Sequence, residues 1–91
     1  MTQVSAPKWT QDQSIAYECA CELIGHLMAI KSEQIERELI ATTPNQERID
    51  ALRLARSALH QEREALNVTD DAAVSRIRTA YGSEVRTYEA A

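Results

Sequence analysis

The sequence predicts an all-α fold: an antiparallel helical hairpin with a long first helix, then a third helix, assembling into an oligomeric helical bundle. The 91 residues include only two glycines and two prolines, and so few turn-forming residues disfavour a β-rich fold. Apolar residues recur at helical intervals in three long segments, each of which follows residues that cap helices. We therefore expect a flexible arm over 1–9 and a single helical domain over 10–91, with helices at about 10–40, 44–66 and 70–88.

The first helix is predicted to begin after Thr10, which stands three residues before Gln13 with the spacing of a capping box. Its apolar residues form two neighbouring stripes, one with Leu23, Leu27 and Ile30 and the other with Ile24, Met28 and Ile35. A helix covered on one side needs a single stripe. We therefore expect two neighbours, one from the same chain and one from a second copy, and these six residues are the predicted subunit interface.

The second helix is predicted from the segment Thr43-Pro44-Asn45-Gln46. We expect Thr43 as the N-cap, Pro44 at the first helical position and Gln46 as the partner that completes a capping box. Three leucines then recur seven residues apart, at Leu52, Leu59 and Leu66. The small side chains of four alanines let a neighbouring backbone approach closely, at Ala51, Ala55, Ala58 and Ala65.

The third helix is predicted to be capped by Thr69, with Asp70 and Asp71 in the first turn, where the helix dipole favours negative charge. Its apolar stripe contains Val74, Ile77, Tyr81 and Tyr88. Both connections between the predicted helices are short, so we expect consecutive helices to run antiparallel.

The chain is acidic, because ten Lys and Arg against 14 Asp and Glu give a net charge of −4. Phosphate backbones repel such a chain, so nucleic acid is not an expected partner. The longest apolar run, residues 27–30, is too short to span a bilayer. Because the first residues also lack the apolar core of a signal peptide, we expect a cytoplasmic protein with no membrane partner.

Few residues are arranged for catalysis. Gly25 and Gly82 both fall within predicted helices, so neither belongs to a phosphate-cradling loop. The serines lack the elbow motif of a nucleophile. Cys19 and Cys21 would point about 200° apart on a helix, so they cannot pair with each other. We therefore predict no enzymatic activity and no cofactor.

One constellation favours a metal site as a lesser alternative. Glu22 and His26 are four residues apart on the first helix, and His60 and Glu64 are four apart on the second. A hairpin that turns around residue 42 places His26 opposite His60, and helical bundles build zinc or di-metal sites in this way. Since His–Glu pairs at this spacing are more often ordinary neighbours on a helix surface, no metal is predicted.

In size, acidity and helical pattern, the chain resembles the small accessory proteins of bacterial plasmids, conjugative elements and phages. The resemblance implies a regulatory or inhibitory binding role. We therefore predict a non-enzymatic helical interaction protein that forms a homodimer or larger oligomer and contacts another protein. An alternative is an acidic inhibitor that covers a basic groove of a nucleic-acid-handling protein with Glu33, Glu36 and Glu38.

Overall fold

The computed structural model describes residues 8–91 and confirms the all-α fold. It contains three helices, α1 (Gln11–Leu39), α2 (Gln46–Ala65) and α3 (Asp71–Ala90), and no strand within the described residues. In that part of the chain, no helix combines the length and the apolar character needed to cross a membrane. Most of the arm predicted over 1–9 lies outside the described residues.

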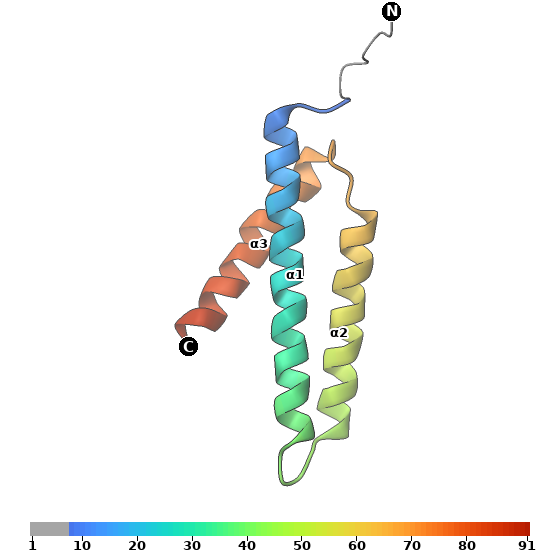
Figure 1. The fold of residues 1–91 in the computed structure, drawn as a ribbon, viewed down its shortest axis with the longest axis vertical. Coiled ribbons are helices and arrows are strands. Elements are labelled where there is room, and N and C mark those ends of the chain that lie inside the picture. The colour runs from blue at the N-terminus through green and yellow to red at the C-terminus, as the bar shows by residue number, and fades with distance from the viewer. Residues whose placement is uncertain (1–7) are drawn as a thin grey trace, which may run out of the picture.

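α1 is the central helix of the molecule. In Figure 1, α2 returns alongside α1, and α3 crosses behind the upper part of α1 and leads away from it at an angle. α1 packs against both of them, whereas the backbones of α2 and α3 stay apart throughout residues 8–91. Side chains join α2 to α3 instead: the Tyr81 hydroxyl donates to Glu62, and Glu62 also pairs with Arg76 at 3.6 Å. One side of α1 is therefore left open between two diverging helices.

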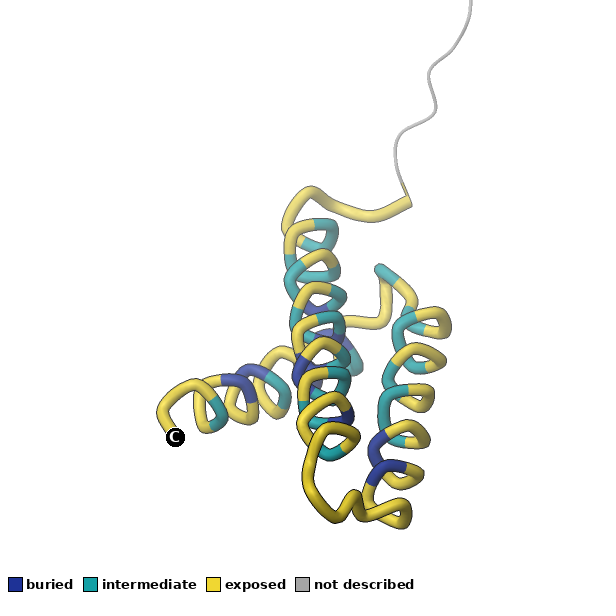
Figure 2. The backbone as a smooth tube through the Cα atoms, turned by 60° about the horizontal axis from the view of Figure 1, so that its bottom comes forward, coloured by how far each residue is buried: buried dark blue, intermediate teal, exposed yellow. Residues whose placement is uncertain are grey.

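The apolar core lies on the two flanks of α1. One group of side chains joins α1 to α3 around the fully buried Ile24 and Ile77. Another group joins the far end of α1 to the start of α2 through Ile35, Ile49 and Leu52. In Figure 2, the buried residues of α2 are confined to its first half, and the remainder of the helix is intermediate or exposed. The second half of α2 is thus only partly covered by its own chain.

α1 begins as predicted. The Gln13 N–H donates to Thr10 Oγ1 at 3.1 Å, and the Thr10 N–H donates to Gln13 Oε1 at 2.9 Å, which completes the capping box. These two bonds satisfy backbone N–H groups that the first turn of a helix otherwise leaves without a partner. The local sequence is therefore sufficient to fix where α1 starts.

The N-cap predicted for α2 is wrong. Asn45 takes this role in place of Thr43, and its Oδ1 accepts from the Arg48 N–H at 3.1 Å. The Asn45 N–H donates to Glu38 Oε1 at 2.9 Å, and this contact from the end of α1 fixes where the chain turns. Pro44 consequently lies in the turn before α2.

The N-cap predicted for α3 is also wrong. Asp70 caps α3, and its Oδ1 accepts from the Ala73 N–H at 3.1 Å. Thr69 does not take this role because its hydroxyl and its N–H both donate to Asn67 Oδ1, at 2.7 and 2.9 Å. α3 then continues without a break through the buried Gly82.

Candidate functional site

The six residues predicted as a subunit interface lie inside a single chain. Ile24, Leu27, Ile30 and Ile35 are buried, and Leu23 and Met28 are half-buried. Their cover comes from α2 and α3 of the same chain, because the two stripes of α1 face these two helices. A dimer stays a prediction, and a second copy would need a different surface to bind.

The structure does not bring together the residues of the metal hypothesis. His26 faces α3, where its Nε2 lies 3.2 Å from Glu89 Oε1. His60 lies on α2, with 3.5 Å between its Nδ1 and the Arg63 guanidinium. The residue of α1 that faces this part of α2 is Gly25, since a Cβ added there would lie 3.3 Å from the Arg63 guanidinium. Within residues 8–91, no three His, Cys, Asp or Glu side chains form a group that could hold a metal ion.

Two of the three carboxylates assigned to an inhibitor surface already have partners in the molecule. Glu33 accepts from the Tyr88 hydroxyl at 3.3 Å, and Glu38 pairs with Arg48 at 3.5 Å. Glu36 is exposed and makes no ion pair within residues 8–91. The acidic face of α1 is therefore interrupted by contacts that hold the fold together.

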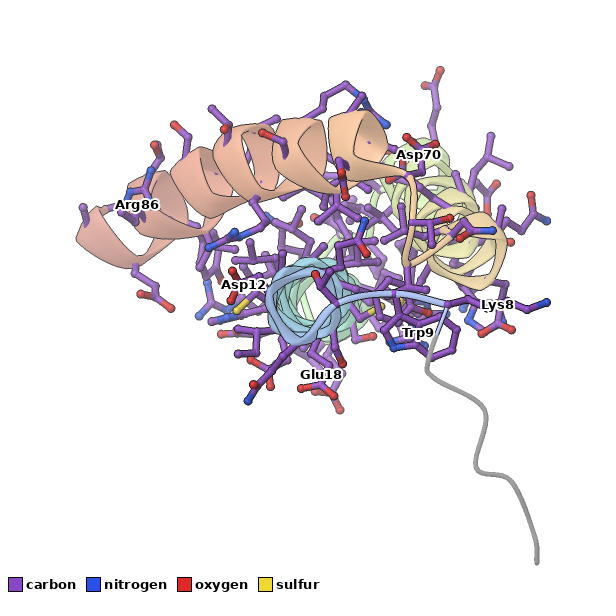
Figure 3. All side chains as sticks on the ribbon, turned by 90° about the horizontal axis from the view of Figure 1, so that it is seen from above. Lys8, Trp9, Asp12, Glu18, Asp70 and Arg86 are labelled. Carbon is purple, nitrogen blue, oxygen red and sulfur yellow. The ribbon has the colours of Figure 1, made fainter. Side chains whose placement is uncertain are left out.

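Further carboxylates lie on outer surfaces. Glu18 and Glu22 are exposed on α1, and Figure 3 shows Glu18 on the side of α1 turned away from α3. Glu64, the helical neighbour of His60 in the metal hypothesis, is exposed on α2. Exposed carboxylates of this kind are typical of a solvated helix face.

α2 carries an apolar face that residues 8–91 leave uncovered. Leu54 is 74% exposed near the middle of this helix. Helical periodicity places Ala51 and Ala58 next to it on one side and Asp50 and Ser57 on the other, and Ala65 follows on the side of the alanines. Ala55 is half-buried about 100° around the helix, where it lines the neighbouring groove. Leu54, Ala51, Ala58 and Ala65 are named the Leu54 face. The sequence pattern pointed to the alanines and missed the leucine, because Leu54 falls outside the seven-residue spacing of the other leucines.

The Leu54 face borders a groove between α2 and α3. A cavity of about 340 Å³ has Leu27 and Lys31 of α1 as its floor, with walls from Ala58 of α2 and Tyr81 of α3. A second cavity of the same size continues along α1 from Leu27 to Gln34. The groove exists because α2 and α3 diverge and leave this side of α1 without a covering helix.

Two polar side chains on the groove floor lack partners. Within residues 8–91, the Lys31 ammonium makes no ion pair and Gln34 Oε1 is buried without a hydrogen-bond donor. A buried acceptor left in this way costs about 1–3 kcal/mol. On the wall, burial and the hydrogen bond to Glu62 raise the pKa of the Tyr81 phenol above its ordinary value. The Lys31 ammonium is therefore the free polar group of the groove floor, whereas Gln34 Oε1 is shielded from solvent.

The groove and the Leu54 face combine apolar area with few polar groups. Aliphatic and aromatic side chains supply most of the groove area, and the Lys31 ammonium supplies a hydrogen-bond donor. Comparisons of the chain with protein-family models, with curated proteins and with solved structures find no match.

Proposed function

We propose that this protein is a non-enzymatic helical interaction protein and that it self-associates through the Leu54 face. The observation that carries the proposal is the 74% exposure of Leu54 beside small alanine side chains. Two further exposed apolar residues, Leu39 and Ile40, lie at the end of α1 and in the turn after it, and they have no long helix face around them. A leucine with small alanine side chains beside it at Ala51 and Ala58 fits a helix that packs closely against another helix.

A second copy of α2 fits this face by symmetry. The midpoint of α2 lies between Ala55 and Arg56, so a two-fold axis near Leu54 brings two antiparallel α2 helices together over most of their length. Each Leu54 then enters the space over Ala51 and Ala58 of the other copy, as a knob enters a hole. The small alanine side chains allow the two helix axes to approach to about 8 Å.

The energetics make Leu54 the deciding residue of this dimer. Burying one leucine side chain contributes about 1.5–3 kcal/mol, and symmetry provides two of them. The loss of translational and rotational freedom opposes association by at least about 4 kcal/mol. Without the two leucines, the contact between alanines is therefore too small to hold the copies together.

The test is the mass of the protein in solution. At concentrations approaching about 1 mM we expect the wild-type protein to have the mass of two chains and Leu54→Glu to have the mass of one. A carboxylate at position 54 would have to lose its water against alanine side chains, which is unfavourable without a partner. Sedimentation velocity measures both masses directly, and circular dichroism shows whether each variant remains helical.

His60→Glu is the matched control for this experiment. It adds the same charge to the same helix, and His60 is exposed about 120° around α2 from Leu54. We expect this variant to keep the mass of two chains. A single-chain mass for the wild-type protein, or a helical Leu54→Glu variant that still has the mass of two chains, would overturn the proposal.

The residues first predicted as the interface cannot provide this test. Ile24 is fully buried, so a charged replacement there would destabilise the core whether or not a dimer forms. The acidic-inhibitor hypothesis has less support from the structure, because Glu33 and Glu38 are held by contacts within the chain. The Leu54 face has no such competing partner within residues 8–91.

A further inference from the structure

A cavity of about 590 Å³ lies between α1 and α3 and shares no lining residue with the groove. Arg78 and Arg86 line it from α3, and His26 lines it from α1. The hydroxyl-bearing residues Ser75 and Thr79 also face this space from α3. The lining is therefore rich in groups that donate hydrogen bonds.

The two arginines of this cavity lack the partners that other arginines of the chain have. Three others each pair with a glutamate, namely Arg37, Arg48 and Arg76. Arg78 and Arg86 make no ion pair or side-chain hydrogen bond within residues 8–91. Glu22 is the single carboxylate of the lining, so two arginines and one glutamate give the cavity a charge of +1 in a chain of −4. The carboxylate of Glu89 pairs with His26 and is not part of the lining.

Gly82 keeps the middle of the cavity open. It lies one turn from Arg78 and one turn from Arg86 on α3. A Cβ added to Gly82 would lie 3.3 Å from the Arg86 guanidinium and 3.9 Å from Leu23 Cδ1. The Arg86 guanidinium thus folds back over the glycine, into space that any other residue would partly fill.

We infer that this cavity binds an oxyanion of the phosphate class, either free or carried by a small molecule. A guanidinium presents a planar fork of donors that matches phosphate oxygens two at a time, and Arg78 and Arg86 supply two such forks. The hydroxyls of Ser75 and Thr79 can donate to the remaining oxygens. Because the chain as a whole repels anions, binding at this place has to come from these local donors.

The test is a titration with inorganic phosphate at constant ionic strength, followed through the backbone amide signals in NMR spectra. We expect saturable shifts along α3, between residues 75 and 86, in the wild-type protein. Loss of a charged donor should weaken binding by about tenfold or more in Arg78→Gln and in Arg86→Gln. A parallel titration with glycerol phosphate distinguishes a phosphorylated small molecule from the free phosphate ion as the natural ligand. Tighter binding than inorganic phosphate indicates a phosphorylated small molecule, and equal binding indicates the free ion.

Arg53→Gln is the matched control for charge. Arg53 is exposed on α2 and, like the cavity arginines, has no partner within residues 8–91. We expect this variant to bind phosphate as the wild-type protein does. Equal binding in all of these proteins, or shifts that chloride reproduces, would overturn the proposal.

A pair of glycine variants separates binding from folding. In Gly82→Ala and Gly25→Ala the added Cβ meets an arginine tip at 3.3 Å, Arg86 in the first case and Arg63 in the second. We expect both variants to fold and to have a higher midpoint of thermal unfolding, because alanine is the better helix former and a flexible side chain can move aside. Only Gly82→Ala should weaken phosphate binding, since it displaces Arg86. An unchanged affinity in Gly82→Ala would contradict the inferred site.

Discussion

Glu62 makes the polar link between the two helices flanking α1. It accepts from the Tyr81 hydroxyl with one carboxylate oxygen, and the other oxygen lies 3.6 Å from the Arg76 guanidinium. Elsewhere in the molecule, helices are held by backbones that pack closely, whereas α2 and α3 stay apart. This carboxylate therefore adds a polar link between α2 and α3 beside the groove, next to the apolar contacts of Leu59 and Leu66.

Tyr81→Phe tests this link because it removes the hydroxyl and keeps the ring. We expect the free energy of unfolding near neutral pH to fall by about 1.5–3 kcal/mol, the range for a hydrogen bond to a charged group. Burial, followed by the bond to Glu62, raises the pKa of Tyr81 in the folded chain. Its stabilisation is therefore complete below the ordinary phenol pKa of about 10 and is lost as the pH rises through the raised value. Urea unfolding at successive alkaline pH values should show a steeper loss of stability in the wild-type protein than in Tyr81→Phe, and identical profiles would show that Glu62 does not hold the hydroxyl.

Single capping residues could be predicted only where the chain offers one candidate. Thr10 stands alone before α1, and its capping box with Gln13 is present. Before α2, the residues Thr43 and Asn45 are both good caps, and the hydrogen bond that the Asn45 N–H donates to Glu38 favours Asn45. That contact joins two helices across a turn, so the local pattern does not contain it.

At the scale of one element, the start of α2 gives a direct test of the corrected cap. Asn45→Ala removes the acceptor of the Arg48 N–H, and we expect it to lower the free energy of unfolding by about 1 kcal/mol. Thr43→Ala is the control, because Thr43 is exposed and makes no cap. Its effect should stay within about 0.5 kcal/mol. Thermal and urea unfolding measure both, and a larger loss in Thr43→Ala than in Asn45→Ala would restore the cap expected from the sequence.

The presence of each helix was more predictable than which helix packs against each of its faces. The double stripe of α1 predicts two neighbours, and α2 and α3 are both present. Periodicity identifies a face that needs cover, and it does not say whether the same chain or a second copy provides it. The rotation of a helix about its own axis is harder to predict from the sequence. Successive residues point about 100° apart, so Gly25 faces α2 while His26 faces α3. His26 and His60 therefore do not meet, and the metal site considered from the sequence does not form.

At the scale of the whole molecule, the arrangement is asymmetric. The buried side chains lie between α1 and its two neighbours. Within the described residues, no further helix covers the side of α1 that forms the groove floor. A chain of 91 residues buries a smaller share of its surface than a larger domain, so additional cover has a large effect on its stability. The Leu54 face and the groove lie on this weakly covered side. Association and folding are therefore expected to be coupled.

This coupling predicts that thermal stability depends on protein concentration. Folded dimer and unfolded single chains are related by mass action, so a hundredfold increase in concentration adds about 2–3 kcal/mol per dimer. For a chain of this size, that corresponds to a rise of roughly 5–10 °C in the unfolding midpoint. Differential scanning calorimetry over a concentration series should show this rise in the wild-type protein and in His60→Glu. Leu54→Glu should unfold at a lower midpoint that does not change with concentration, because a single chain has no association step to shift. A constant midpoint in the wild-type protein would show that each chain folds without a second copy.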